Sequence, residues 1–440
     1  MFEYVEHGIL ERPEEEEKWD LDKFKKIFRV ENVSKPESLT LEFDMLNVDC
    51  SFANALRRML IAEVPSVAID RIYMYQNTSV ISDETLSLRI ALIPLNIDPS
   101  QVPFPQQPLP ADDAVASLDA SSHFLFDFSE KCTKDFLKND PTAATNKSRW
   151  IYSSSLKWLP LPGQEERYSE CKPGPVNEKI LINKLVLGTE LEAKCLAVKG
   201  LGRDHAKFQP VSACYYKFHP RITLNERVEG QMAETLKSSF ADGVIEIEPV
   251  TGVAKVANPR LDNGSREHMR HPELKSSVKV FVDPKQCIFT VESVARPPEK
   301  LLIEAFGVML EKCQHFLAVT DKCEFGGMFK DGDDVSSSLV CGRLVSLQVL
   351  AMSTDGSRAT FRFDGEDHTL GAALRFCILR NKDAKFCGYC VPHPLEDCIH
   401  LEVHAKRDLS AVELLKSGLK TLQAAFEHMR NCFDISFSQL

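Results

Sequence analysis

The sequence predicts an α+β protein in which two related units lie in one chain, the first of them interrupted by a β-rich insertion. Three observations support this fold class. A strand, a capped helix and a helix with a long apolar stripe occur in both halves of the chain. A proline-rich stretch breaks the first copy, and a segment rich in Gly, Asp and Ser separates the copies. The 440 residues leave room for about three domains.

The first unit begins with a strand and a helix, after an acidic extension over 1–20. Every second residue is apolar over 37–45, which is typical of a half-buried strand. These residues are Leu39, Leu41, Phe43 and Met45. Asp49 or Ser51 can cap the helix that follows, and the helix ends at 64–65, where a proline cannot continue it.

A β-rich insertion follows the next predicted strand, over 67–77. Five prolines crowd a short stretch here: Pro99, Pro103, Pro105, Pro108 and Pro110. Such a cluster marks a domain boundary rather than a continuing element. We therefore expect an inserted β-rich domain over 96–272, which splits the first unit into 21–95 and 273–321.

The first unit closes with a predicted hairpin and a long helix. Two apolar runs within 278–294 flank the segment Asp-Pro-Lys-Gln at 283–286, a signal for a β-hairpin. Pro298 then opens a helix that extends to about Thr320 and carries an apolar stripe. Its members are Leu302, Phe306, Met309, Cys313 and Phe316. The segment 322–342 has the composition of a flexible linker.

The second unit, over 343–440, repeats the plan of the first. Strands are predicted at 344–352, 358–364, 385–391 and 398–404, and helices at 368–381 and 410–433. An offset of 318 positions aligns the two units. It pairs Phe43 with Phe361, Asp49 with Asp367, and Ala55-Leu56-Arg57 with Ala373-Leu374-Arg375.

The last helix carries an unbroken apolar stripe like that of the helix at 298–320. Its members are Val412, Leu415, Leu419, Leu422, Phe426 and Met429. A stripe of this length is not stable in water and must be covered. Each stripe can pack on the sheet of its own unit, or the two can pack on each other, and the presence of two copies favours the second arrangement.

Charge and composition disfavour nucleic-acid-binding, membrane and secreted proteins. The net charge of −11 disfavours direct binding to nucleic acid. No apolar run approaches the roughly 20 residues of a membrane span, so we expect no transmembrane helix. The acidic N-terminus is unlike a signal peptide. The 14 cysteines stand mostly alone and are typical of small buried residues in a reducing compartment, so we expect a protein kept inside the cell.

Two short motifs resemble the RNA polymerase alpha family. Residues 51–58, Ser-Phe-Ala-Asn-Ala-Leu-Arg-Arg, resemble its signature Thr-Leu-Gly-Asn-Ala-Leu-Arg-Arg, and residues 369–375 resemble it again. Residues 20–320 are similar to the larger alpha-like subunit shared by eukaryotic RNA polymerases I and III, and residues 344–435 to its smaller partner. The segments that carry this likeness are 21–26, 62–70, 77–84, 203–211, 364–371 and 386–394.

The resemblance implies two alpha-type dimerisation domains that form an intramolecular pseudo-dimer. It also implies a non-catalytic platform, without a cofactor, in the nucleus (nucleolus and nucleoplasm), serving the transcription of rRNA, tRNA and 5S RNA. The implied partners are the largest and second-largest polymerase subunits and other small subunits, with no sequence-specific contact to nucleic acid and no membrane. The dimer interface would contain Phe52, Leu56, Leu302, Phe306, Met309, Phe316, Leu370, Leu374, Val412, Leu415, Leu419, Leu422, Phe426 and Met429.

Three arginines are the candidates for contact with the large subunits: Arg57, Arg58 and Arg375. Adjacent helical residues diverge by about 100°, so the first two serve different faces and at least one should reach outward. Arginine is favoured at interface cores, and the alternative is a surface ion pair of little energetic value. The sequence departs from the family pattern at three positions. The pattern leads us to expect His, Gly and a second Arg, but this chain has Leu88, Ala91 and Phe376.

The sequence contains none of the phosphate-loop, nucleophile-elbow and zinc-protease motifs. Cys387 and Cys390 are the best metal candidates, but in a strand they point to opposite faces, so we expect no metal. His400, Glu402 and His404 share one face of a strand, for which a solvated sheet face is the favoured interpretation.

Two other hypotheses stay open at this point. One is the equivalent platform of RNA polymerase II or of an archaeal-type polymerase, against which the 203–211 segment argues. The other is a metal or redox protein built on the cysteines.

Overall fold

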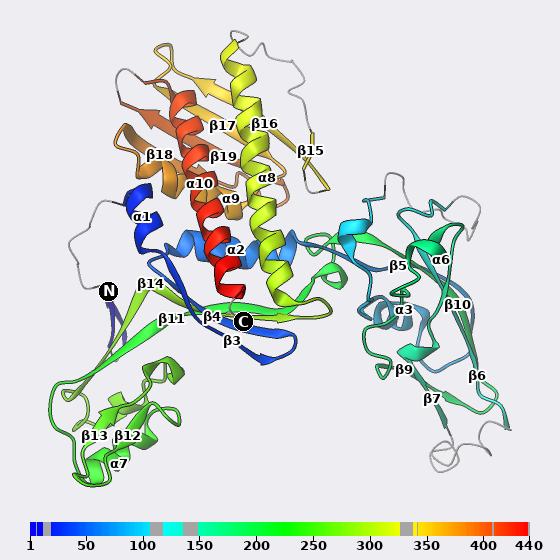
Figure 1. Ribbon diagram of the computed structural model, residues 1–440, viewed down its shortest axis with the longest axis horizontal. Helices are drawn as coiled ribbons and strands as arrows, with labels where there is room; N and C mark the ends of the chain where they lie inside the picture. The colour runs from blue at the N-terminus through cyan, green and yellow to red at the C-terminus, as the bar shows by residue number, and fades with distance from the viewer. Residues whose placement is uncertain are drawn as a thin grey trace.

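The computed structural model describes residues 1–5, 7–11, 19–105, 118–134, 148–325, 338–340, 342–406 and 409–438. We call residues 1–325 the first half and residues 338–438 the second half. A central body contains the long helices, and two lobes extend from its base, one at the right and a smaller one at the lower left of Figure 1. In the part of the chain just given, no helix is both long and apolar enough to cross a membrane.

A six-stranded antiparallel sheet forms the base of the central body. Its strands are β1 (Phe2–Val5), β2 (Gly8–Glu11), β3 (Arg29–Glu37), β4 (Thr40–Leu46), β11 (Val211–Leu224) and β14 (Val278–Ser293). The order is β2-β1-β14-β4-β3, and β11 pairs with β14 along its length. The alternation predicted near 37–45 is confirmed in β4, where Leu41, Phe43 and Met45 are fully buried.

The hairpin predicted at 278–294 is wrong, because both apolar runs belong to the single strand β14. Each run pairs with β11 rather than with the other, and the register shifts so that Asp283 faces His219 and Cys287 faces Phe218. The residues between them form a bulge. This bulge lies where the neighbour on the other edge of β14 changes from β4 to β1.

The acidic extension expected over 1–20 is structured in part. β1 and β2 form a hairpin that adds to the central sheet, since Phe2 pairs with Val282 of β14. Trp19 packs against the main core. The glutamates at 14–17 lie outside the described residues.

The second half contains a five-stranded antiparallel sheet of order β15-β16-β17-β19-β18. Its strands are β15 (Ser338–Val340), β16 (Arg343–Met352), β17 (Arg358–Asp364), β18 (Ala384–Cys390) and β19 (Cys398–Ala405). The four strands predicted after residue 343 correspond to β16, β17, β18 and β19. Most of the predicted linker over 322–342 lies outside the described residues.

Five helices pack between the two sheets or along their edges (Figure 1). They are α1 (Leu21–Ile27), α2 (Cys50–Ala62), α8 (Pro298–Phe325), α9 (His368–Leu379) and α10 (Ala411–Phe437). The predicted caps are confirmed: Asp49 accepts from the Ser51 N–H at 2.9 Å, and Asp367 accepts from the Thr369 N–H at 2.8 Å. The two residues therefore occupy the same position in the two halves.

The long helices α8 and α10 lie side by side and share one core with both sheets. Phe306 of α8 lies with its ring centroid 5.3 Å from that of Phe433 of α10. Each helix also contacts the sheet of the other half: Phe316 lies 5.0 Å from Phe363 of β17, and Phe433 lies 5.0 Å from Phe43 of β4. The stripes therefore pack on each other as well as on the sheets.

The region 96–272 differs from the single insertion that the sequence predicts. It contains two separate apolar cores, and β11 between them belongs to the central sheet. The larger lobe already includes the strand at 65–77, before the proline-rich stretch, because Val67 and Leu86 share one core with Ile97. No comparable signal in the sequence marks the return to the central sheet. Only the pairing partner of β11, which is distant in sequence, places it there.

The larger lobe surrounds a four-stranded sheet and the smaller lobe a two-stranded sheet. The larger contains α3 (Asp83–Ala91), α6 (Gln164–Arg167), β5 (Pro65–Asn77), β6 (Phe124–Lys131), β7 (Ser148–Tyr152), β8 (Lys157–Leu159), β9 (Leu181–Val186) and β10 (Glu190–Leu201). The smaller contains α7 (Gln231–Ser238), β12 (Ile245–Ile247) and β13 (Ala254–Val256). Short 3-10 helices occur at Pro99–Gln101, Ser153–Ser155, Ala206–Phe208, Pro259–Leu261 and Glu267–Arg270.

We predict that Phe306→Ala lowers the free energy of unfolding by about 3–5 kcal/mol, because it opens a cavity where α8 meets α10. Urea unfolding followed by circular dichroism measures this change. Leu379→Ala on α9, where the side chain is 39% exposed, is the control and should cost less than about 1 kcal/mol. Equal urea midpoints for the two variants would contradict the shared core.

Candidate assembly interface

The candidate site is the contact between α2 of the first half and α9 of the second half, with the long helices beside it. Phe52 and Leu56 on α2, and Leu370 and Leu374 on α9, are fully buried in the common core. The end of α2 meets the beginning of α9, because Arg58 reaches Asp367. The beginning of α2 meets the end of α9, because Phe52 lies 5.2 Å from Phe376.

At one end of this helix pair, arginines of the first half bind the cap of α9. Arg58 donates from Nη2 to Asp367 Oδ2 at 2.8 Å and from Nε to Thr369 Oγ1 at 2.9 Å. Arg203 approaches the same carboxylate at 3.3 Å and donates to Asp397 Oδ1 at 2.7 Å. Burial alone would raise the pKa of Asp367, but the hydrogen bonds from Thr369 and the two arginines lower it to about 2.

A glycine brings Arg203 into place. A Cβ atom at Gly202 would lie 2.1 Å from the carbonyl oxygen of Ile61, so no side chain fits where this loop touches the last turn of α2. The Arg203 N–H then donates to the Ala62 carbonyl at 3.0 Å. The close approach fixes the arginine beside the helix junction.

A buried ionic triad lies next to this charged end. Lys312 Nζ of α8 lies 2.7 Å from Glu63 Oε2 and 2.9 Å from Glu366 Oε2, and none of the three side chains is more than 9% exposed. Burial raises the pKa of Glu366 to about 7, although Lys312 opposes the shift. Burial would lower the pKa of Lys312, but the two carboxylates raise it. The ammonium therefore stays charged and holds the two halves together.

The opposite end of the helix pair is aromatic. The Phe376 ring lies 5.2 Å from that of Phe52 and 5.3 Å from that of Trp19. Phe52 in turn lies 5.6 Å from Phe426 of α10. Phe376 occupies the position that Arg58 has in the first half, so the departure from the family motif has a structural reason. One end of the pair is joined by charge and the other by aromatic packing.

Two related family models match this chain. Both are described as the RNA polymerase Rpb3/Rpb11 dimerisation domain, and they match residues 42–313 and 358–431. The chain belongs to the Rpb3/Rpb11 dimerisation-domain family. The first match covers more than half of the chain and spans the segments on both sides of the lobes.

Named relatives agree with this membership in the Rpb3/Rpb11 family. DNA-directed RNA polymerases I and III subunit RPAC1 of Bos taurus is 40% identical over 69% of this chain and 87% of its own length. The subunit of the same name in Saccharomyces cerevisiae is 35% identical over 68% of this chain and 90% of its length. DNA-directed RNA polymerase subunit Rpo3 of Methanosphaera stadtmanae is 27% identical over 62% of this chain and 92% of its length.

The structure places the residues predicted for the dimer interface together in one core of this Rpb3/Rpb11-type chain. Val412 is half-buried at its edge. The fully buried members are Phe52, Leu56, Leu302, Phe306, Met309, Phe316, Leu370, Leu374, Leu415, Leu419, Leu422, Phe426 and Met429.

The three predicted arginine contacts divide into different environments. Arg58 points inward to Asp367, and Arg57 is half-buried and donates to Asn54 Oδ1 at 2.9 and 3.1 Å. Arg375 on α9 is exposed. Sequence reasoning missed Lys312, whose only signal is a charged residue beside the apolar stripe of α8.

The structure supplies no metal centre among the described residues, where no three His, Cys, Asp or Glu side chains are arranged to hold an ion. Cys387 is buried and Cys390 exposed on β18, as the strand geometry predicts. Burial raises the pKa of the Cys387 thiol to about 12. His404 and Glu402 form a hydrogen bond of 2.7 Å on the same strand face.

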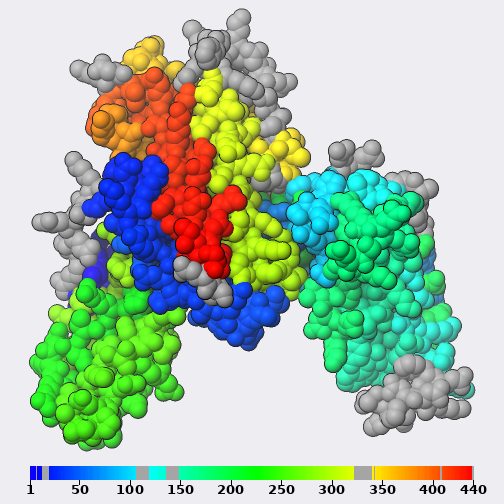
Figure 2. Space-filling model, viewed as in Figure 1, coloured from blue at the N-terminus to red at the C-terminus, as the bar shows by residue number. Residues whose placement is uncertain are grey.

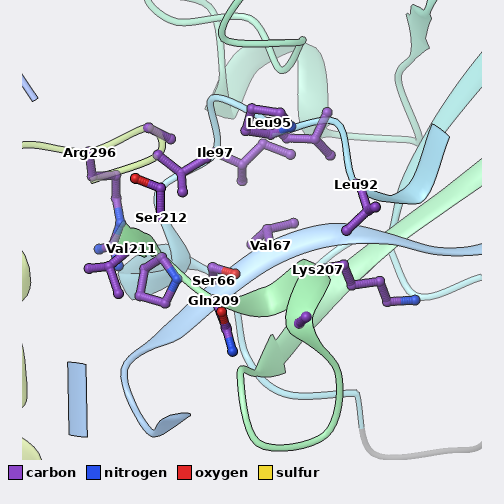
Figure 3. Close-up of a pocket in the computed structure, with 15 residues that line it drawn as sticks. Ser66, Val67, Leu92, Leu95, Ile97, Lys207, Gln209, Val211, Ser212 and Arg296 are labelled. Atoms are coloured by element: carbon purple, nitrogen blue, oxygen red, sulfur yellow. The ribbon is translucent and has the colours of Figure 1, made fainter. Parts of the chain in front are cut away.

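A cavity of about 220 Å³ lies where the larger lobe joins the central sheet (Figure 3). Its lining combines apolar residues such as Leu95 and Ile97 with Lys207 and Arg296. Both cations are already paired, since Lys207 binds Asp70 and Arg296 binds Glu304 at 2.6 Å. The cavity therefore offers no uncompensated charge to a ligand.

The lowered pKa of Asp367 predicts a pH dependence. Its folded value of about 2 lies below its ordinary 3.8, so the stabilisation is present above about pH 4 and is lost as the pH falls toward 2. The loss should reach about 1 kcal/mol at pH 3 and should be smaller in Asp367→Asn, which keeps the cap. Urea midpoints at pH 5 and pH 3 measure it.

Asp49→Asn, at the matching cap of α2, is the control because Asp49 has no ion pair among the described residues. This variant should retain the wild-type difference between the two pH values. An equal loss in wild type and Asp367→Asn would show that the ion pairs of Asp367 contribute nothing.

Proposed function

We propose that this chain is a non-catalytic assembly subunit of DNA-directed RNA polymerases I and III that contains both alpha-like partners of such an enzyme. The observation that carries the proposal is the match of two Rpb3/Rpb11 dimerisation domains in one chain whose long helices share a single core. The relatives named as subunits of polymerases I and III are up to 40% identical. The nucleus is the proposed location.

The two halves form an intramolecular pseudo-dimer in this proposal. The first is a split domain (21–95 and 273–321), and the second spans 343–440. Segment 322–342 links them, and region 96–272 is the β-rich insertion, to whose larger lobe residues 65–95 also contribute and from which β11 returns to the central sheet. Tethering gives each half a local concentration of about millimolar, which makes the pairing nearly unimolecular and fixes a one-to-one ratio.

The large subunits dock on a surface formed by both halves. Arg375 is exposed on α9, and Arg57 occupies the equivalent position on α2 with its guanidinium held by Asn54. Arginine suits such a surface because its planar fork donates several hydrogen bonds at once. Arg58 is not part of this surface, since its guanidinium serves the contact between the halves. The net charge of −11 supports assembly through proteins rather than direct contact with nucleic acid.

Polymerase II is the weaker alternative. DNA-directed RNA polymerases II, IV and V subunit 3 of Arabidopsis thaliana is 29% identical over 66% of this chain, against 40% for the polymerase I and III relatives. Purification of the tagged intact chain from its own cells, followed by mass spectrometry, distinguishes the two. Recovery of the largest and second-largest subunits of polymerases I and III supports the proposal, and recovery of polymerase II subunits alone overturns it.

We predict that Arg375→Glu reduces the recovery of the large subunits at least tenfold, because it reverses an exposed charge on the docking surface. The variant should unfold at the wild-type temperature. Arg358→Glu, an equal charge reversal at the exposed start of β17, is the control and should recover the large subunits normally. Equal recovery with both variants would remove Arg375 from the surface.

Protease cleavage provides a test of the paired architecture. A protease site inserted within 326–337 should allow one cut, after which the two fragments elute together from a sizing column, because α8 and α10 remain packed. Fragments that separate at micromolar concentration would show that the tether, rather than the shared core, holds the halves together.

A further inference from the structure

We infer that Glu366 and Asp367 prevent the second half from pairing with another copy of itself, because in the described part of the chain the cations that pair with them belong to the first half. This inference rests on the proposed pairing of two alpha-type halves and adds the residues that select the correct partner. The partner that these residues select is the first half of this chain.

Both acidic residues are removed from water at the junction of the halves. Glu366 is 1% exposed, and the side chain of Asp367 is 21% exposed. All the side chains that pair with their carboxylates from outside the second half carry positive charge: Lys312, Arg58 and Arg203. Removal of such a partner leaves an unpaired charge in the interior, which strongly destabilises the folded pair.

The internal repeat shows what a pair of two second halves would bring to the same place. The offset of 318 positions that aligns Asp49 with Asp367 also aligns Arg58 with Phe376. The apolar stripes of α8 and α10 repeat at the same steps of four and three residues. When Leu302 of α8 is aligned with Leu415 of α10, Lys312 aligns with Ala425. Two cations are thus replaced by a phenyl ring and a methyl group.

The neighbouring positions are also unlike. Val48 of the first half is fully buried at the position that precedes the cap, where the second half has Glu366. A pair of two second halves would therefore bury Glu366 and Asp367 twice, without Lys312, Arg58 or Arg203. The first half has a valine there and supplies its own Glu63 to Lys312, so the penalty falls on the second half.

Packing at the aromatic end of the α2–α9 pair also favours the first half as the partner of the second half. Phe376 replaces an arginine and packs on Trp19 and Phe52, which both belong to the first half. In a pair of second halves, the residue opposite Phe376 would be Leu370, which the repeat aligns with Phe52. The correct pair thus gains aromatic contacts at one end and charge compensation at the other.

The test uses the full chain with a protease site inserted within 326–337, folded and then cut. Native mass spectrometry after exchange in mild urea counts the pairs of first with second fragment and of second with second fragment. In the wild type, the second fragment should pair with itself less than about one hundredth as often as with the first. Glu366→Val with Asp367→Asn should raise that fraction at least tenfold.

A matched control changes two exposed acidic residues of the second half, Glu402→Val and Asp434→Asn, with the same change in net charge. Its second fragment should not pair with itself. Self-pairing as abundant in the wild type as in the Glu366→Val, Asp367→Asn variant would overturn the inference. Mixed pairs in both samples would leave the proposed function intact, whereas wild-type fragments that never pair would contradict the proposed function instead.

A second measurement covers the case in which the acidic variant fails to fold. With Glu63→Gln present in every chain, so that the other carboxylate held by Lys312 is not left charged, Lys312→Met should weaken the mixed pair by at least about a hundredfold, because Glu366 stays buried without its ammonium. Adding Glu366→Val to Lys312→Met should restore most of the affinity. Equal affinities with and without Lys312→Met, or no recovery when Glu366→Val is added, would overturn the role of Glu366.

Discussion

The contact of α8 with α10 is the interaction on which the rest of the structure depends. Neither apolar stripe is covered by its own sheet alone, so each helix is placed between a sheet of its own half and the helix and sheet of the other. The hydrophobic effect drives this burial without specifying a partner. In Figure 2 the two helices run the length of the central body as one continuous packed surface. Loss of the contact would expose the core that the two halves share.

Polar groups supply the specificity that apolar burial lacks. Lys312, Glu63 and Glu366 are costly to bury, and well-packed apolar residues could replace them without loss of stability in many proteins. Because they lie where the two halves meet, their contribution is to the choice of partner rather than to stability. Lys312 and Glu63 pair within the first half, but Glu366 reaches the ammonium only when the two halves meet with the end of α2 against the beginning of α9.

Sequence patterns within a few residues predicted most of the helices and strands. The features that they did not predict depend on pairing between strands that are far apart in the sequence. The caps at Asp49 and Asp367 and the stripes of the long helices could be read because they depend on residues within a few positions. The bulge in β14 and the return of β11 to the central sheet could not, since both depend on which distant strand lies alongside. The roles of Lys312 and Arg203 were hidden for the same reason: their partners are far away in sequence or in the other half.

The path of β11 has a mechanical consequence for the two lobes. The strand leaves the larger lobe at Val211, crosses the central sheet and enters the smaller lobe near Ile222. Its 14 residues span about 46 Å and are bonded to β14 along that distance. The two lobes are therefore joined directly through one strand of the central sheet, and the bulge opposite Phe218 and His219 is the place along it where the pairing is interrupted and the connection can bend.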